Sequence, residues 1–229
     1  FDDNNVRMAI KLSLDREALL RTLLRGHGAV GNDHPISTAN QYHASYLPQR
    51  EYDPERAKWF LRQSGLESLA VDIYLADTAF AGAVDTGVLF KEHAKASGID
   101  ITVHQEPKDG YWSAIWMQKG WCASYWGGRP TEDWMFSVAY ASGGNWNESF
   151  MEHDQFNKLL VAARAELDSD KRREMYGRMQ SIVRDQGGSV VPVFSNYVFA
   201  MNKSVQHGPS MAANWDMDGL RGFERWWFA

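Results

Sequence analysis

Residues 120–136 read Gly-Trp-Cys-Ala-Ser-Tyr-Trp-Gly-Gly-Arg-Pro-Thr-Glu-Asp-Trp-Met-Phe. The apolar run from Trp121 to Trp126 is too short for a helix, and a Gly-Gly-Arg-Pro turn and a helix-start signal follow it. The stretch is therefore predicted to run from a strand through a loop into a helix. Loops at strand ends commonly hold ligands. The aromatic rings, two glycines and single arginine of this loop favour recognition of a small molecule over covalent chemistry.

Helices and strands are predicted to alternate on both sides of this stretch. Apolar residues at helical spacing, with capping residues before them, predict helices over about 6–25 (with a break at Asp15), 53–64, 78–97, 112–116, 156–167 and 168–186. Alternating apolar residues predict strands at 71–75 and 99–103, and short apolar runs predict strands at 190–194 and 197–201. Residues 26–46 are expected to be a long irregular segment. This order indicates an α/β fold with a largely parallel sheet flanked by helices.

Composition excludes several classes of function. The net charge is −5 and the sequence has no Lys/Arg block, which argues against nucleic-acid and anionic-membrane surfaces. The single cysteine, Cys122, excludes an internal disulfide and a Cys-based zinc site. The histidines form no HExxH motif, so no protein metal site and no cofactor are expected, although His34 and His43 lie in the long loop. With 10 tryptophans, some rings are expected to line a surface or a cleft.

Candidate residues in and near the central stretch each allow two interpretations. Arg129 either engages a ligand or pairs with Glu132 or Asp133. Those two carboxylates suggest an acid/base pair, but acids after Thr131 also favour the dipole of a helix's first turn, which is the preferred interpretation.

The aromatic residues are assigned by their spacing. Trp126 is expected in the cleft, with Tyr125 on the opposite face of the strand. Trp112 and Trp116 are expected in the core because they share a helical apolar stripe. The segment from Asn145 to Glu148, with Trp146, is either a second ligand-facing loop or a surface turn.

Four stretches together resemble the solute-binding proteins of ABC importers, in the family that binds peptides, dipeptides and nickel complexes. They are Val6-Arg7-Met8-Ala9-Ile10 with Ser13-Leu14-Asp15-Arg16-Glu17, Tyr52-Asp53-Pro54-Glu55-Arg56-Ala57-Lys58, Phe156 to Ala165 followed by Lys171-Arg172-Arg173-Glu174-Met175-Tyr176, and Val191-Pro192-Val193-Phe194. They span most of the chain, and their order is more specific than any one of them.

The resemblance implies a lobe of the type II periplasmic-binding-protein kind. Residues 1–191 would form the third domain of the family, and residues 192–229 would cross back to a first-domain lobe that this chain lacks. The chain starts with Phe-Asp-Asp-Asn-Asn, without a Met or a signal region, and is expected to be a piece of a longer protein. The resemblance also implies a periplasmic location, a hinge-closing cleft and membrane permeases as partners.

The resemblance departs at one position. Peptide-binding members carry Trp-x-Ala-Asp or a similar sequence at this strand end, and the Asp holds the amino group of the peptide. Here Arg129 stands where that Asp would be, so it is expected to engage a carboxylate or another anion. The sequence thus predicts a non-enzymatic protein for a peptide-like or anionic ligand, with Arg129, Trp126, Tyr125, Gly128, Asn145 and Trp146 at the site. A sugar ligand and a hydrolase that uses Glu132 or Asp133 are the alternatives.

Overall fold

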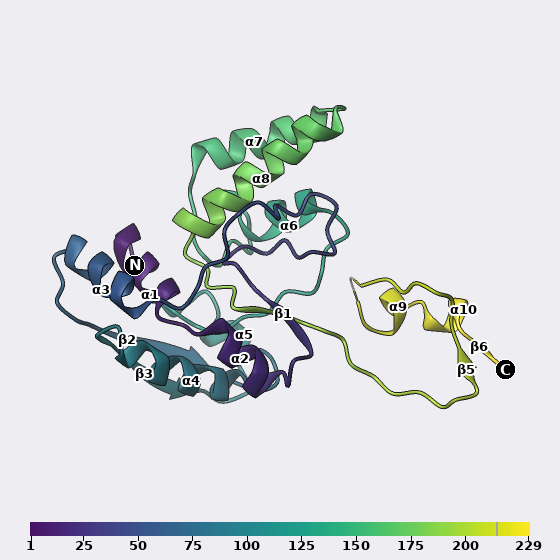
Figure 1. The fold of residues 1–229 in the computed structure, drawn as a ribbon, viewed down its shortest axis with the longest axis horizontal. Coiled ribbons are helices and arrows are strands. Elements are labelled where there is room, and N and C mark those ends of the chain that lie inside the picture. Colours follow the sequence, from purple (N-terminus) through teal and green to yellow (C-terminus); the bar gives the residue numbers. More distant parts are fainter. Residues whose placement is uncertain (214) are drawn as a thin grey trace.

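The computed structural model describes residues 1–213 and 215–229. The helices are α1 (Asn4–Leu12), α2 (Arg16–Leu23), α3 (Pro54–Gln63), α4 (Ala83–Lys95), α5 (Tyr111–Ala114), α6 (Glu132–Ala139), α7 (Asp154–Ala165), α8 (Ser169–Gln186), α9 (Asp216–Leu220) and α10 (Gly222–Arg225). The strands are β1 (Gly28–Val30), β2 (Leu69–Leu75), β3 (Ile99–Gln105), β4 (Val193–Ser195), β5 (Val205–Gln206) and β6 (Trp227–Phe228). Figure 1 shows a main body, with α7 and α8 at one end, and a smaller C-terminal unit beside it.

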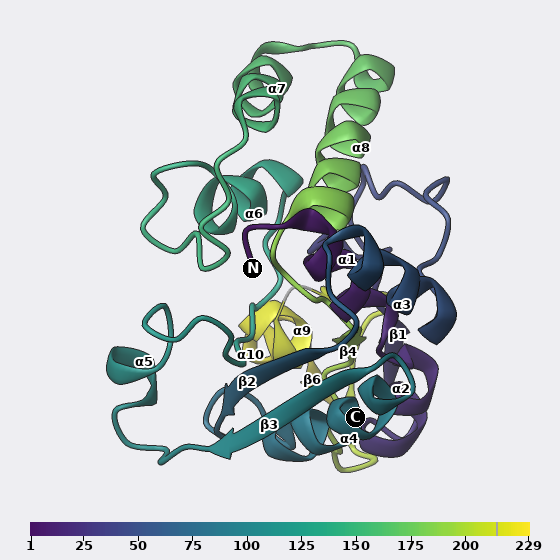
Figure 2. The ribbon, with the colours of Figure 1, turned by 90° about the vertical axis from the view of Figure 1, so that its left-hand side faces the viewer.

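The longest strands form a parallel ladder. β2 and β3 pair in register from Leu69 with Ile99 to Leu75 with Gln105, and α4 is the crossover that joins them. A single parallel bridge between Tyr74 and Cys122 adds a third segment on the other side of β2. Two short pairs, β1 with β4 and β5 with β6, are antiparallel. The α/β class expected from the sequence is therefore confirmed, and Figure 2 shows α4 lying along the β2–β3 pair.

Two hydrophobic cores hold the body together. The sheet core lies among α1 to α4 and the parallel ladder, and the helical core lies among α6, α7 and α8. Buried members of the sheet core include Ala9, Ile10, Leu14, Leu19, Leu61, Ile73, Leu75, Phe90, Ile99, Ile101, Tyr111 and Ile115. Buried members of the helical core include Ile36, Tyr42, Met135, Phe136, Phe156, Leu160, Tyr176, Met179 and Val183.

Several helices begin at the residues that the sequence predicts, because a side chain caps the first turn. The carboxylate of Asp15 accepts from the amide of Ala18 at 2.8 Å, and the Asp53 carboxylate accepts from Arg56 at 2.9 Å. The hydroxyl of Thr131 accepts from the amide of Trp134 at 3.2 Å. Each cap satisfies a backbone donor that the helix leaves free. The predicted break at Asp15 is confirmed, since α1 and α2 are separate helices.

The strand predicted from Trp121 to Trp126 is wrong beyond its start. The chain pairs with Tyr74 only through the Trp121 carbonyl and the Ala123 amide, each at 3.0 Å. The hydroxyl of Tyr111 then donates to the Ala123 carbonyl at 2.8 Å, which takes an acceptor that a longer strand would use. The chain continues without regular structure from Ala123 to the start of α6.

The helix predicted over 78–97 begins later, at Ala83. Gly82 lies in the left-handed region with φ of 81°, and the Asp77 carboxylate accepts from the amide of Val84 at 3.3 Å. A left-handed residue cannot continue a right-handed helix, so the turn before Gly82 stays separate. On α4, Val88 is 48% exposed, whereas Phe90 is buried in the sheet core.

The prediction that Trp112 belongs to the core is also wrong. The helix there, α5, is only four residues long, and its buried ring is Tyr111. Trp112 is 39% exposed and Trp116 is partly buried. A longer helical stripe does not form because Met117 adopts a positive φ of 57° three residues after α5 ends.

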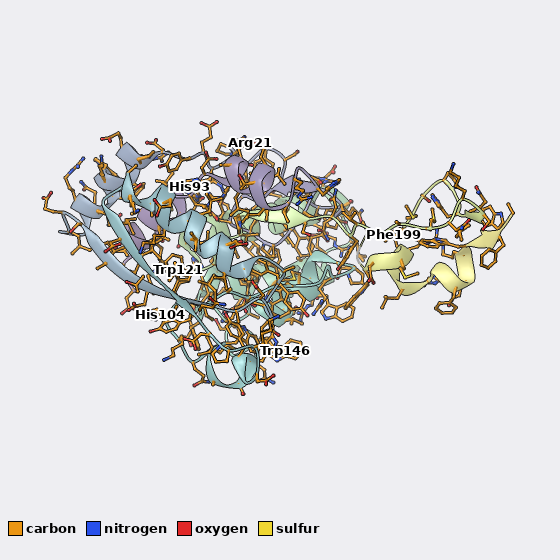
Figure 3. The ribbon with its side chains drawn as sticks, turned by 90° about the horizontal axis from the view of Figure 1, so that it is seen from below. Arg21, His93, His104, Trp121, Trp146 and Phe199 are labelled. Atoms are coloured by element: carbon orange, nitrogen blue, oxygen red, sulfur yellow. The ribbon has the colours of Figure 1, made fainter. Side chains whose placement is uncertain are left out.

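Two other segments, residues 26–46 and 197–201, also differ from the prediction. Residues 26–46 contain β1, whose partner β4 comes from far along the sequence. The strand predicted at 197–201 is absent, and Tyr197, Val198 and Phe199 are exposed there. Figure 3 shows Phe199 where the chain leaves the body toward the C-terminal unit. The division into 1–191 and 192–229 stays a prediction, and β4 is the last strand that pairs with the body.

Candidate functional site

The loop after the Cys122 bridge lines a large open cleft. The cleft has a volume of about 1600 Å³, and its walls come from the body and from the C-terminal segment. Tyr125, Trp126, Gly128 and Arg129 all line it, and Met211 and Trp215 lie on its other side. The structure thus brings four of the six predicted site residues to one surface. Gly127 lies close to the ring of Trp215, so the loop and the C-terminal segment meet at this point.

Arg129 lies between two indole rings. Its guanidinium carbon is 5.3 Å from the centre of the Trp126 ring and 5.7 Å from that of Trp134. Its Nη1 donates to the carbonyl of Gly127 at 2.9 Å, and among the described residues its buried Nε has no hydrogen-bond partner. Within residues 1–213 and 215–229, no carboxylate pairs with this guanidinium. An arginine that stacks on aromatic faces keeps unused donors for a planar anion.

The alternative pairing of Arg129 with Glu132 or Asp133 is wrong. Asp133 pairs with Arg164, whose Nε lies 2.7 Å from its carboxylate. Glu132 is 4% exposed and accepts from the backbone amide of Tyr42 at 2.8 Å. Both acids occupy the first turn of α6, where the helix dipole favours negative charge. The interpretation preferred from the sequence is the one that the structure supports.

Tyr125 and Trp126 lie on the same cleft, not on opposite faces. The chain is not a strand here, so the alternation of side chains that was expected does not apply. Tyr125 is 60% exposed and meets the ring of Trp112 edge to face. Trp126 is partly buried and packs against the helical core.

Asn145 and Trp146 lie outside the lining of the cleft. Asn145 is exposed, and Trp146 is 49% exposed with its ring centre 6.0 Å from that of Trp126. Figure 3 shows Trp146 at the edge of the body. Trp146 therefore extends the aromatic surface of the cleft through Trp126, whereas Asn145 makes no such contact.

Glu148 is the cleft residue that sequence reasoning missed. Its Oε2 accepts from the indole of Trp116 at 2.6 Å, and its Oε1 accepts from the indole of Trp126 at 2.8 Å. The segment from Asn145 to Glu148 was singled out, but its polar pattern did not indicate which residue faces the cleft. The partners of Glu148 are 32 and 22 positions away, so no local pattern predicts the contacts.

A buried charge network lies beside the antiparallel pair of β1 and β4. The carboxylate of Asp33 contacts Arg16 and Arg50, each at 2.7 Å. Burial opposes ionisation, but the cations Arg16, Lys11 and Arg50 lower the pKa of Asp33 below its ordinary value. The ammonium of Lys11 donates to the carbonyls of Arg184 and Gly187 at the end of α8, at 2.9 and 2.7 Å. Burial lowers the pKa of Lys11 to about 8.

His34 and His43 come together beside this network, with ring centres 5.9 Å apart. Burial, and then the neighbouring His43, lower the pKa of His34 to about 4. In the part of the chain that the structure describes, no three metal-ligating side chains gather into a cluster. The buried His34 and the partly buried His43 thus form a pair without further ligands among the described residues. Nor does any described helix combine the length and apolar character needed to cross a membrane.

Comparison with known proteins identifies the relatives. A family model of bacterial extracellular solute-binding proteins, family 5 middle, matches residues 1–148. The dipeptide-binding protein of Escherichia coli K12 is 26% identical over 222 residues, which are 90% of this chain and 40% of that protein. A di/tripeptide-binding protein 3 of Pseudomonas aeruginosa is 23% identical over 217 residues, with the same coverage. The chain spans about two fifths of the length of these relatives.

Solved structures share the fold. HbpA2 from Haemophilus parasuis has a TM-score of 0.75 at 19% identity and matches 89% of this chain and 42% of its own. NikZ from Campylobacter jejuni, solved with Ni(L-His), has a TM-score of 0.70 at 17% identity and matches 89% and 44%. The relatives are named as binding proteins and not as enzymes, which confirms the non-enzymatic expectation. Since the family model covers more than half of the sequence, the chain belongs to the bacterial extracellular solute-binding proteins of family 5.

Proposed function

We propose that this chain is the part of an ABC-importer solute-binding protein that contacts an anionic group of a small ligand through Arg129. The protein works outside the cytoplasmic membrane and delivers the ligand to permease subunits. The ligand is peptide-like or another small anion. Family membership supports the binding function, and the surroundings of Arg129 support the anionic character of the ligand.

The state of Arg129 is the single observation that carries this proposal. Two indoles flank its guanidinium, one donor goes to the Gly127 carbonyl, and the buried Nε has no partner within residues 1–213 and 215–229. A buried donor that stays unpaired costs free energy of about 1–3 kcal/mol. A carboxylate in the cleft would pair with the charge of the guanidinium and accept from its terminal N–H groups, with the geometry that a guanidinium fork favours.

Native mass spectrometry of the protein expressed in full tests the ligand class. The expected result is one bound small molecule that carries a carboxylate or another anionic group. A bound neutral molecule would contradict the proposal. It would favour the sugar alternative, for which the exposed ring of Tyr125 is the supporting observation, because sugars stack on aromatic faces.

Defined probes then test the role of Arg129. Trialanine and its C-terminal amide differ only in the terminal carboxylate, so wild-type protein is expected to bind trialanine more tightly. Arg129→Gln is expected to reduce this preference by roughly tenfold, the size of one charge-assisted hydrogen bond. The matched control is Arg21→Gln, which removes an exposed charge on α2 that does not line the cleft; Figure 3 labels Arg21. Equal preference in both variants would reject the assignment.

A further inference from the structure

Glu148 connects two tryptophans that come from different parts of the body. Trp116 follows α5, whose Tyr111 belongs to the sheet core, whereas Trp126 packs on the helical core. Each carboxylate oxygen accepts one indole N–H, at 2.6 Å from Trp116 and 2.8 Å from Trp126. Hydrogen bonds to an ionised carboxylate are stronger than neutral ones. One side chain therefore fixes the orientation of both rings.

The loop that carries Glu148 is itself held in place. The preceding residue, Asn147, is 5% exposed, and its amide group donates to the carbonyl of Met151 at 2.8 Å. Its side-chain oxygen also accepts from the amide of Met151 and the hydroxyl of Ser149, at 3.2 and 3.1 Å. These bonds close the loop on both sides of Glu148. The hydrogen bonds of Asn147 therefore fix the loop that carries the Glu148 carboxylate, which lies 22 residues after Trp126 in the sequence.

The ring of Trp126 is held at its edge and on its face. Glu148 binds its N–H, Arg129 lies over the ring, and Trp146 packs at 6.0 Å. If the indole turns, the guanidinium loses one of its two flanking rings. Glu148, Trp126 and Arg129 all line the same cleft.

From these contacts we propose that Glu148 is a positioning residue of the ligand site. It holds Trp126 in the orientation that keeps Arg129 in place for an anionic ligand. The ligand-related half of this inference rests on the proposed function. The orienting half concerns the indoles alone and can be tested without any ligand.

The first test is the ¹H–¹⁵N spectrum of the indole groups in Glu148→Gln. A glutamine carries an NH2 donor in place of one of the two carboxylate oxygens, so the present arrangement, with one indole N–H on each oxygen, cannot be kept. Of the 10 tryptophan indole signals, those of Trp116 and Trp126 are expected to move and the others to stay. Trp116→Phe and Trp126→Phe assign the two signals. Glu174→Gln, which removes an exposed carboxylate on α8, is the control, and unmoved signals in Glu148→Gln would overturn the proposal.

The second test is a double-mutant cycle with trialanine as the probe. Glu148→Gln is expected to weaken binding roughly three- to thirtyfold in wild-type protein, the usual range for coupled neighbours. In the Trp126→Phe background the N–H is already absent, so the same change is expected to alter binding less than about twofold. Equal weakening in both backgrounds would show that Glu148 does not act through Trp126 and would overturn the proposal.

Two further results distinguish a failure of the proposed function from a failure of the proposed role of Glu148. If wild-type protein does not bind trialanine, the peptide-like ligand of the proposed function fails, while the indole spectrum still decides whether Glu148 orients the rings. If Glu148→Gln does not fold, Glu148→Asp replaces it. The shorter side chain cannot reach both indoles in their present positions, so the signals of Trp116 and Trp126 are again expected to move, and unmoved signals would overturn the proposal.

Discussion

The carboxylate of Asp33 accepts hydrogen bonds from Nη2 of Arg16 at 2.7 and 2.8 Å, and both side chains are at most 2% exposed. The amide of Val191, just before β4, donates to the same carboxylate at 3.1 Å. Arg16 belongs to α2, and Asp33 follows β1. This buried pair therefore joins α2 to the antiparallel pair of β1 and β4.

Replacing Asp33 by Asn is expected to lower the free energy of unfolding by about 3–5 kcal/mol. The variant leaves the buried guanidinium of Arg16 without a counter-charge and leaves Arg50 with the partly exposed Asp185 alone among the described carboxylates. Urea unfolding followed by circular dichroism measures the change. Asp185→Asn is the control, since its side chain is 37% exposed, and it is expected to cost clearly less. Equal losses would show that burial of the pair is not the cause.

Acid is expected to destabilise the protein through His34. The pKa of this 1% exposed side chain falls from 6.5 to about 4 on folding, mainly because of burial. Between these values the unfolded chain binds a proton that the folded chain does not. The free energy of unfolding contributed by His34 is therefore complete above pH 6.5 and decreases toward pH 4, by about 3 kcal/mol at most.

The pH dependence can be assigned to His34 by comparing wild-type protein with His34→Gln. Denaturant unfolding at several pH values from 4 to 7 is the measurement. The variant is expected to show a smaller decrease over this interval. If both proteins lose stability in parallel, other groups cause the pH dependence.

Gly31→Ala is expected to lower the free energy of unfolding by roughly 1–3 kcal/mol, because Gly31 lies at the end of the antiparallel pair of β1 and β4. A methyl group there would meet the backbone carbonyl of Val191, which cannot rotate away as a side chain does. The midpoint of thermal unfolding measures the effect. Gly208→Ala, with no atom of the described residues within 4 Å of the new methyl group, is expected to leave the midpoint unchanged. A midpoint for Gly31→Ala equal to that of the control would refute the steric argument.

Trp126→Ala is expected to weaken binding of trialanine by tenfold or more, because it removes a ring that flanks Arg129. Asn145→Ala, at an exposed position outside the cleft, is expected to change the affinity less than about twofold, as surface changes usually do. Isothermal titration calorimetry measures both. Comparable losses in the two variants would show that the loop at Asn145 also belongs to the site.

The sequence by itself determined the α/β class, most helix starts and the parallel pair β2–β3. The reason is that these features depend on neighbours in the chain. Asp15, Asp53 and Thr131 cap amides only three positions ahead, and the alternation in β2 and β3 concerns adjacent residues. The order of the quoted stretches also predicted the family, since motifs in sequence need no coordinates.

Tertiary structure alone decided the length of the strand at Trp121 and the surroundings of the site. The Tyr111 hydroxyl, 12 residues before Ala123 in the chain, donates to the Ala123 carbonyl at the point where the pairing stops. Glu148 reaches two indoles across 32 and 22 residues, and Asp33 reaches Val191 across 158. Contacts between remote segments depend on how the two cores pack. The fold therefore decides which group a carboxylate or a guanidinium contacts, and the neighbouring residues in the sequence do not.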